Sequence, residues 1–524
     1  MPLIASFHAA DWLVVVAYLA AMAGMGWYFS RRQTSLDRYL LAERNMSWLP
    51  VGLSLMAALN SGMDYLMQPS STIKFGIVLT AGIFSWVLLY PWVARIVFPF
   101  YHRLDFYTVY EFLEARFDVK VRTLAAVIFI VWRLGWTATA MFVPSLAINA
   151  VTAGQVPLNT STIVVGVVVT ITTMLGGIQG VIWTDVVQFF VMFGGLTATV
   201  AICWASIPGG FPEIWNTAMQ AGLLNPSPAL TDPAATGAVG HVMSFLQQPM
   251  TLPSLMIALV VGRAATYTSD QIMVQRLQTT RSLAETRRAF VINAAGDALW
   301  MLGLSFVGFA LLAYFRTHPL PVEYQTDKLV PYFMSLAFPA GAVGLVIAAI
   351  AAASMSSLNS AINSCSSVAV VDLYNRLWLG KSLQRGQHTP EEERRQIWIS
   401  KAFVLFFGFA GTIAAVNVSR LGSLLEINSR VVNAFNGPLF GIYVLGMFCA
   451  AARANAVLAA GLAGAAVSYY VAFHSTLGFL WPTTFGFGAT VLVGWSLAFA
   501  WPAPAGATGR SLTFAAVTKP DGMR

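Results

Sequence analysis

Long apolar segments, separated by short polar connections, run along almost the whole chain. Apolar stretches of about 20 residues are typical of membrane-spanning helices, and the pattern predicts about thirteen of them. The predicted spans cover residues 9–29, 47–73, 76–100, 121–151, 160–178, 181–206, 251–275, 287–315, 333–373, 398–418, 422–451, 455–475 and 479–501. We therefore expect an all-α polytopic membrane protein.

Composition supports this fold class and excludes an ordinary soluble protein. With 57% hydrophobic and only 10% charged residues in 524, the chain cannot be a soluble globule of ordinary composition. The three cysteines, Cys203, Cys365 and Cys449, lie in apolar segments without paired spacing, which predicts neither a disulfide framework nor a zinc site. The first residues lack the basic region and cleavage site of a signal peptide, so we expect the first apolar segment to be retained.

The distribution of Lys and Arg predicts the orientation, because cytoplasmic loops carry the excess of basic residues. With the N-terminus outside and the C-terminus inside, the basic C-terminal tail and most basic residues lie in the cytoplasm: Arg31, Arg32, Arg38, Arg44, Arg103, Arg116, Lys120, Arg122, Arg276, Arg281, Arg287, Arg288, Arg376, Lys381, Arg385, Arg394 and Arg395. The outer connections carry only Arg316, Lys328 and Arg420. The net charge of +8 reflects this bias in a plasma-membrane protein and does not indicate nucleic-acid binding.

Two predicted spans are interrupted in a similar way. In 47–73 the apolar run gives way at residues 60–63 to Asp64, and in 251–275 it is followed by Gly262, Arg263 and then residues 266–270. Spans two to six and seven to eleven then form two sets of five, each opening with a broken helix, as in transporters built from inverted repeats. Unwound backbone is tolerated in lipid only where it is buried or lines a cavity, so the breaks predict a binding site at mid-membrane depth. Harmless kinks are the alternative.

The predicted organisation is a single transmembrane transporter domain over residues 1–524. Its parts are a leading helix and loop (9–46), a first repeat (47–206), a second repeat (251–451), two trailing helices (455–501) and a cytoplasmic tail (502–524). No connection is long enough for a separate soluble domain. Glu426 and Arg430 lie four residues apart on a predicted helix and most simply form a local ion pair.

Small polar residues form a stripe in the span 333–373. Helical spacing of three and four places these residues on one face: Ala353, Ser356, Ser357, Ser360, Ser364 and Ser367. Serine stripes in membrane helices usually serve close packing and hydrogen bonds between helices. A hard cation, however, needs several oxygen ligands, and adjacent hydroxyls with free carbonyls from a neighbouring broken helix would supply them. The segment alone leaves both interpretations open.

Three motifs resemble the sodium:solute symporter family, which includes sodium-coupled sugar, monocarboxylate, iodide, proline and sialic acid transporters. They are GGIQGVIWTDVVQ at 176–188, SDQIMVQRLQTTRSLAETRRAF at 269–290 and SMSSLNSAINSCSSVAVVDLY at 354–374. Their order and spacing are similar to the family pattern, and the resemblance spans nearly the whole chain. It implies a five-plus-five inverted-repeat core with broken first and sixth core helices and one helix ahead of it.

The resemblance also implies ion sites. The common sodium site lies between the first and eighth core helices; its ligands here would be the carbonyls of Ala57, Asn60 and Ala353 and the hydroxyls of Ser356 and Ser357. Some members bind a second sodium near the residue that matches Asp185, with Asn359 and Ser360 at the other matching positions. The family often has a hydroxyl residue where this chain has Asn359. Na⁺ is thus the expected coupling ion.

Charged residues inside spans cost about 2.5–3.5 kcal/mol on insertion scales and point to function. An arginine fork suits a carboxylate, and sialic acid transporters of the family use an arginine on the core helix that carries Arg133. The substrate-binding residues we expect are Ser61, Asp64, Arg133, Arg263 and Thr266. The alternative is that Arg133 or Arg263 pairs internally, with Asp64 or Asp297, and never meets the substrate.

The expected function is sodium-coupled import of a small organic anion, either a carboxylate or an acidic sugar, by alternating access. A neutral sugar or an amino acid stays open, since a zwitterion would use both an arginine and Asp64. A membrane sensor acting with a separate signalling partner is the alternative from another class, because similar transporter domains occur fused to histidine kinases. An enzyme is not expected. The predicted partners are the solute, sodium and the lipid bilayer, without nucleic acid or an obligatory protein partner.

Overall fold

The structure is a computed structural model that describes residues 7–31, 35–104, 106–226, 229–320, 328–381, 389–418, 433–501 and 511–518. Within these ranges the regular structure is helical, with no β-strand and one isolated bridge between Met46 and Thr280. The all-α fold class is therefore confirmed. The predicted pair of Glu426 and Arg430 and most of the predicted tail (502–524) lie outside the described residues.

The helices follow one another along the chain with few long connections. In order they are α1 (Ala9–Ser30), α2 (Leu36–Leu41), η1 (Ala42–Arg44), α3 (Trp48–Leu59), α4 (Gly62–Phe75), η2 (Gly76–Phe84), α5 (Ser85–Trp92), η3 (Val93–Val97), α6 (Phe98–His102), α7 (Glu111–Arg116), α8 (Val119–Val151), α9 (Leu158–Ala205), α10 (Gly210–Gln220), α11 (Gly237–Gln247), α12 (Leu252–Ser269), α13 (Gln271–Gln278), α14 (Leu283–Thr317), α15 (Leu329–Ala337), α16 (Ala342–Val368), η5 (Ala369–Trp378), α17 (Pro390–Val418), α19 (Asn433–Phe448), α20 (Ala454–Phe473), α21 (Pro482–Ala500) and α22 (Phe514–Val517).

Nine described helices are long and apolar enough to cross a membrane, and ten if α11 and α12, bent by 61°, count as one span. The count differs from the predicted thirteen partly because two long helical runs each cover two predicted spans. α9 has 48 residues, about 72 Å at 1.5 Å per residue, against a hydrocarbon core about 30 Å thick. Its backbone leaves the helical region at Gly177, where φ is 53°, so it divides there. The run from α4 to α6 divides at Gly76, where φ is 66°. The remaining two predicted spans, 251–275 and 422–451, contain α12 and α19, which are not among the nine helices.

The first predicted break lies where the sequence placed it. α3 ends at Leu59, Asn60 has extended backbone (φ −96°, ψ 136°), and α4 begins at Gly62. Ser61 caps α4: its hydroxyl accepts from the Met63 N–H at 3.2 Å, and its own N–H donates to the Asp64 carboxylate at 2.6 Å. This reciprocal capping satisfies backbone groups that the break would otherwise leave unpaired.

The second break lies at the end of the interrupted stretch that the sequence predicts, residues 262–270. Gly262 and Arg263 lie inside α12, which continues to Ser269. The interruption is at Asp270, whose backbone is extended and whose carboxylate accepts from the Ile272 N–H at 3.0 Å at the start of α13. Aspartate is a strong helix N-cap, whereas a single glycine is common within membrane helices, so Asp270 was the better signal.

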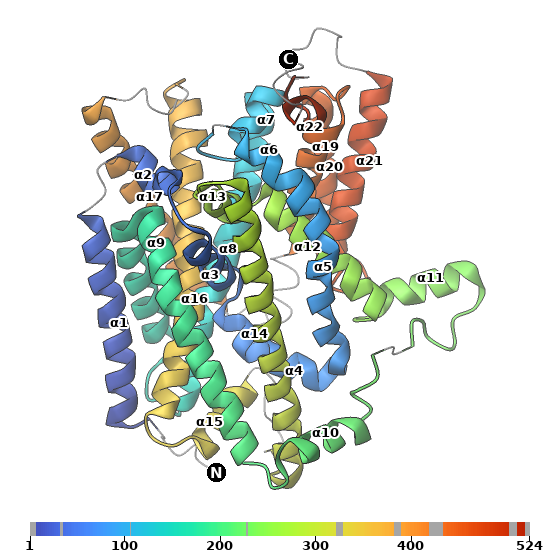
Figure 1. Cartoon of the computed structure of the whole chain (residues 1–524). Coiled ribbons are helices and arrows are strands. Elements are labelled where there is room, and N and C mark those ends of the chain that lie inside the picture. Colours follow the sequence, from blue (N-terminus) through green and yellow to red (C-terminus); the bar gives the residue numbers. More distant parts are fainter. Residues whose placement is uncertain are drawn as a thin grey trace.

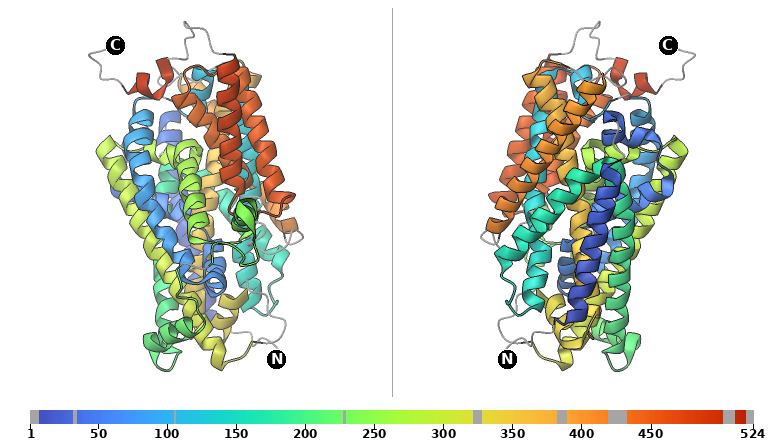
Figure 2. Two further views of the ribbon diagram at one scale, coloured as in Figure 1. Left: turned by 90° about the vertical axis from the view of Figure 1, so that its right-hand side faces the viewer. Right: turned by 90° about the vertical axis from the view of Figure 1, so that its left-hand side faces the viewer.

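The broken helices meet α16 in the interior of the bundle. α16 is buried along nearly its whole length; it packs against α8 and α9 and also contacts α3 and α4. Figure 1 shows α3 and α16 within the bundle, with α1 at one side and α20 and α21 at the other. In Figure 2 the C-terminal helices, in red, face the viewer on the left, and α1, in dark blue, faces the viewer on the right. The start of α1 and α22 lie at opposite ends of the molecule (Figure 1), as an odd number of crossings requires.

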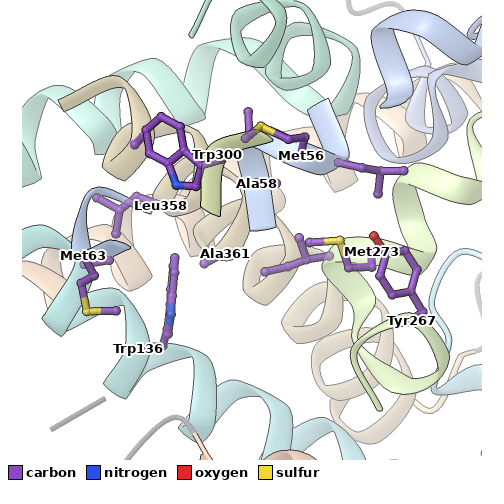
Figure 3. Close-up of a cluster of buried hydrophobic side chains, with 14 of the residues drawn as sticks. Met56, Ala58, Met63, Trp136, Tyr267, Met273, Trp300, Leu358 and Ala361 are labelled. Atoms are coloured by element: carbon purple, nitrogen blue, oxygen red, sulfur yellow. The ribbon is translucent and has the colours of Figure 1, made fainter. Parts of the chain in front are cut away.

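Apolar side chains fix these elements against one another. Figure 3 shows a cluster of buried apolar side chains. Its labelled residues come from the two broken helices (α3–α4 and α12–α13) and from α8, α14 and α16: Met56, Ala58, Met63, Trp136, Tyr267, Met273, Trp300, Leu358 and Ala361. All nine are buried. Tyr267 and Met273 lie on either side of the break at Asp270, so the second broken helix is packed on both halves. The two breaks are thus surrounded by closely packed apolar side chains.

Candidate functional site

Oxygen atoms of α3 and α16 converge next to the first break. The Ser356 hydroxyl donates to the Ala57 carbonyl at 2.7 Å and to the Ala353 carbonyl at 3.0 Å. The Ser357 hydroxyl donates to the same Ala353 carbonyl at 2.8 Å. These four residues are fully buried. The structure therefore brings together four of the five predicted sodium ligands.

The break explains why the Ala57 carbonyl is free to meet α16. In an uninterrupted helix it would accept the N–H of Ser61, four residues on. That N–H instead donates to the Asp64 carboxylate. The fifth predicted ligand, Asn60, is also buried, and its main-chain N–H and side-chain amide both donate to the Met56 carbonyl at 3.1 Å. Asn60 lies where the chain leaves α3, so the oxygen cluster lies directly at the break.

A cavity of about 210 Å³ lies beside the break. Its lining residues come from α3 to α4, α12 and α14: Leu59, Asn60, Asp64, Gln68, Arg263, Asp297, Trp300, Met301 and Leu304. Two of the five predicted substrate residues, Asp64 and Arg263, are among them. Asn60 joins this cavity to the oxygen cluster of α3 and α16.

Arg263 is paired at the wall of the cavity. Its guanidinium donates to the Asp297 carboxylate at 2.8 Å and to the Gly82 carbonyl at 3.1 Å, and it contacts the Ser85 hydroxyl. The guanidinium also lies over the ring of Trp86, 4.0 Å from the ring centre. The alternative of internal pairing with Asp297 is thus observed, although Arg263 still lines the cavity.

Asp64 is the third ionisable residue of the cavity, beside Arg263 and Asp297. It accepts from the Ser61 N–H and makes no ion pair with any residue in the described ranges. Two carboxyl groups and one guanidinium therefore line the cavity, and the carboxyl group of Asp64 has no cationic partner in the described ranges. Such a cavity favours a ligand with a cationic group or several hydrogen-bond donors near Asp64.

The other three predicted substrate residues are not among the residues that line the cavity. Arg133 forms a buried ion pair with Asp270, and its guanidinium lies 4.0 Å from the ring centre of Trp132. The Thr266 hydroxyl donates to a carbonyl of its own helix at 2.9 Å. Ser61 is used in capping α4. The sequence did not single out Asp270 as the partner of Arg133.

The predicted second ion site holds an arginine. Arg276 donates to the Asp185 carboxylate at 2.9 Å and to the Ser54 hydroxyl at 2.8 Å, and it contacts the Ser360 hydroxyl. Arg276 is fully buried in α13 and does not lie in an exposed connection after the predicted span 251–275. The physical reason is that α13 folds into the bundle against α3 and α16, where Asp185 balances the charge. The third predicted residue, Asn359, accepts from the Thr173 hydroxyl at 2.7 Å.

Comparison with known proteins identifies the architecture. A sequence profile described as the sodium:solute symporter family matches residues 39–464. The chain belongs to the sodium:solute symporter family. It is a membrane-embedded multi-pass transporter rather than an enzyme, and sodium is its coupling ion. The prediction of sodium-coupled symport is thereby confirmed.

Two relatives match this symporter over nearly their whole length, and a third over about three quarters of its own. It is 29% identical over 502 residues to the sodium/sialic acid symporter NanT of Aliivibrio fischeri (94% of this chain, 93% of the relative). It is 28% identical over 492 residues to the sodium/sialic acid symporter SiaT of Proteus mirabilis (93% and 94%). The human sodium-coupled monocarboxylate transporter 1 is 30% identical over 483 residues (89% and 74%).

Two solved structures share its fold. One is described as a substrate-bound outward-open state of a Na⁺-coupled sialic acid symporter that reveals a novel Na⁺ site; it has a TM-score of 0.83 and 28% identity, with 95% of this chain and 99% of that chain covered. The other, the nucleobase-cation-symport-1 family transporter Mhp1, has a TM-score of 0.55 and 14% identity over 92% and 98%, and supports the fold alone. The inverted-repeat fold class is confirmed.

A charge network at the ends of α7, α8 and η5 was missed by the sequence reasoning. Arg122 pairs with Glu114 at 2.8 Å and with Asp372 at 2.6 Å, and Arg376 pairs with Glu114 at 2.6 Å. Glu111 accepts the neighbouring N–H groups of Tyr107 and Thr108. The sequence does not show these pairs, because the paired residues lie up to 262 positions apart along the chain. The network ties η5, which continues α16, to the start of α8.

Proposed function

We propose that this symporter imports a small organic acid together with sodium, and that the solute carboxylate contacts Arg263 in the cavity beside the first break. The observation that carries the proposal is that one residue, Asn60, belongs both to this cavity and to the predicted sodium ligands. The names of NanT, SiaT and the monocarboxylate transporter describe organic acids as their solutes. The cavity of about 210 Å³ is smaller than the roughly 300–1,000 Å³ of drug-sized sites, which favours a small solute.

The proposed sodium ligands are the carbonyls of Ala57, Asn60 and Ala353 and the hydroxyls of Ser356 and Ser357. Support comes from the chemistry of this set, since neutral oxygens are the ligands that hard cations prefer. Each hydroxyl now donates to a carbonyl, and rotation about its C–O bond would present its lone pairs to an ion instead. A bound ion would then join α3 to α16 through shared oxygen ligands.

Coupling follows from this arrangement. Sodium entering from outside gains about 2.3 kcal/mol per charge per 100 mV of membrane potential. If the ion orders the break at Asn60, it also orders one wall of the solute cavity, and the solute must then strengthen sodium binding by the same factor. Loss of the ion to the cytoplasm would let α3 and α16 separate and release the solute. We place the protein in the plasma membrane with its N-terminus outside, and the two repeats at 47–206 and 251–451.

A zwitterionic amino acid is the second candidate solute. The unbalanced carboxylate of Asp64 favours it, because an ammonium group there and a carboxylate at Arg263 would both be matched. A monoanion would meet only Arg263, which already has Asp297 as its partner. The two candidates differ by one positive charge on the solute.

Thermal-shift measurements on the purified protein test both. Monocarboxylates, amino acids, acidic sugars and neutral sugars are compared with and without sodium. We expect solutes that carry a carboxylate to stabilise the protein only when sodium is present. A solute that does so should then accumulate in proteoliposomes when a sodium gradient is applied. Ser356→Ala and Ser357→Ala should abolish both effects, whereas Ser367→Ala, a matched control on the same helix with a hydrogen bond to its own helix at 2.9 Å, should not. Stabilisation only by neutral sugars would refute the proposal.

A further inference from the structure

α11 (Gly237–Gln247) extends sideways from the bundle, and none of its residues is buried (Figure 1). Apolar side chains recur at the spacing i, i+3, i+4 and i+7, which places them on one face of the helix. These residues are Val239, Val242, Met243 and Leu246. Val239 and Val242 are exposed over 77% and 57% of their surface. An exposed apolar face of this kind marks a surface that contacts a partner or a membrane.

The opposite face of α11 is polar and lies against the chain that leads into the helix. It carries Gly240, His241, Ser244 and Gln247. The Ser244 hydroxyl accepts from the Asp232 N–H at 2.6 Å. Ala234 and Ala235 line one cavity together with Gly240. The connection before α11 therefore covers part of the polar face and leaves the apolar face open.

Contacts at the C-terminal end of α11 fix its position relative to the membrane spans. The Leu246 carbonyl accepts from the Gly478 N–H at 2.8 Å. The rings of Phe245 and Trp481 meet edge to face, with their centres 5.7 Å apart. Gly478 and Trp481 belong to the connection between α20 and α21, on the side of the molecule where α1 begins (Figure 1). The end of α11 thus lies where these two spans leave the hydrocarbon region.

Exposed aromatic side chains mark the same level of the molecule. Tyr469, Tyr470 and Phe473 are exposed in the last turn of α20. Tyrosine and tryptophan gather where a membrane meets water. A helix that leaves the bundle sideways at this level runs along the surface of the bilayer. Its apolar face therefore continues the lipid-facing surface of α20 and α21.

We propose that the apolar face of α11 rests in the lipid bilayer, at the boundary between headgroups and acyl chains. Interfacial helices bury an apolar face about 5–10 Å into this boundary. α11 contains no Lys, Arg, Asp or Glu, so the contact depends on acyl chains and not on anionic headgroups. α12 follows α11 after a bend of 61° and carries Arg263 of the solute cavity. The bilayer surface thus holds the near end of a helix that lines this cavity.

Spin-label accessibility in proteoliposomes tests the contact. The full-length protein is labelled after Val239→Cys, Val242→Cys or His241→Cys, and the native cysteines are buried, so the unsubstituted protein should take up no label. Collisions with oxygen, which concentrates among acyl chains, are compared with collisions with a water-soluble nickel chelate present on both sides of the membrane. The oxygen-to-nickel ratio should be higher at Val239 and Val242 than at His241, which is exposed on the polar face. It should be the same in phosphatidylcholine vesicles with and without phosphatidylglycerol.

Two matched substitutions test whether the apolar face causes the contact. With the label at Val239→Cys, Val242→Asp should abolish the high ratio, because acyl chains do not accommodate a carboxylate. His241→Asp adds the same charge on the polar face and should leave the ratio unchanged.

Three results would overturn the inference. Equal nickel access at Val239, Val242 and His241 would place α11 in water. Low access of both reagents at Val239 and Val242 would show a protein surface there, such as a second copy of the chain. A ratio that rises only when phosphatidylglycerol is present would make the contact one with anionic headgroups. These measurements use neither sodium nor solute, so they leave the test of the proposed function separate.

Discussion

The first turn of α4 approaches α16 so closely that a single methyl group should disturb sodium binding. A Cβ built at Gly62 would overlap the Ser354 hydroxyl and lie 2.7 Å from the Ile350 carbonyl oxygen. Overpacking of this kind costs about 1–3 kcal/mol. Since α4 and α16 must be close together when an ion is shared between α3 and α16, the cost should fall on the ion-bound state. We therefore expect Gly62→Ala to weaken sodium binding by about 5- to 150-fold, at 1.4 kcal/mol per factor of ten.

Two further variants make the argument specific. The Ser354 hydroxyl is buried without a hydrogen-bond partner in the described ranges, so Ser354→Ala should cost little, and in the Gly62→Ala background it should restore part of the affinity. Gly194 on α9 has no atom within 4 Å of an added Cβ and serves as the control. Sodium titrations followed by thermal shift or radioactive sodium binding measure all four proteins. Equal sodium affinities of Gly62→Ala and Gly194→Ala would refute the reasoning.

Three other substitutions probe different parts of the structure. Arg263→Gln alone should destabilise the protein by about 3–5 kcal/mol because it leaves Asp297 buried without its partner. The double variant Arg263→Gln, Asp297→Asn should fold but should no longer be stabilised by carboxylate ligands. If these ligands still stabilise it, Arg263 is not part of the solute site. Burial raises the pKa of Glu111 from 4.5 to about 7, so its contribution to stability is full below pH 4.5 and is lost as pH rises to 7. Each pKa unit corresponds to about 1.4 kcal/mol. Melting temperatures at pH 5 and 8 should therefore differ less in Glu111→Gln, and an equal difference would contradict this. Gly177→Ala should lower the melting temperature relative to Gly176→Ala, because φ of 53° at Gly177 costs other residues about 1–3 kcal/mol; equal melting would refute the division of α9 there.

Local sequence signals were sufficient for most of the fold. The spans follow from runs of apolar residues, and the first break from the polar residues 60–64, because both depend only on neighbours in the chain. The second break lies at Asp270, the last residue of the predicted interruption, because Gly262 is a weak signal, whereas Ser269 followed by Asp270 has the character of a helix cap. The division at Gly76 was predicted, because the predicted spans 47–73 and 76–100 meet there.

The candidate site needed information that no local pattern contains. Arg276 was assigned to a cytoplasmic loop because basic residues near span ends usually lie there. Its partner Asp185 is 91 positions away, and only the folded chain brings the two together. The pairing of Arg133 with Asp270 spans 137 positions. The oxygen cluster of Ala57, Ser356 and Ser357 was found because its motif resembles a known family and not because of its physical chemistry alone.

The buried charges determine how the membrane potential should act on transport. Three arginines within the bundle each pair with an aspartate: Arg133 with Asp270, Arg263 with Asp297 and Arg276 with Asp185. Asp64 makes no ion pair with a described residue. For a given number of sodium ions, the net charge carried inward in each cycle then depends on the charge of the solute.

Uptake under an imposed potential separates the two solute classes. One sodium ion with a monocarboxylate moves no net charge, whereas one sodium ion with an amino acid moves one positive charge. An inside-negative potential of 100 mV supplies about 2.3 kcal/mol per charge, which should raise the accumulation of an amino acid about 50-fold. In proteoliposomes with a fixed sodium gradient, a potassium diffusion potential set with valinomycin should leave the accumulation of a monocarboxylate unchanged. If the potential instead drives accumulation of a monocarboxylate, more than one sodium ion must accompany each solute molecule.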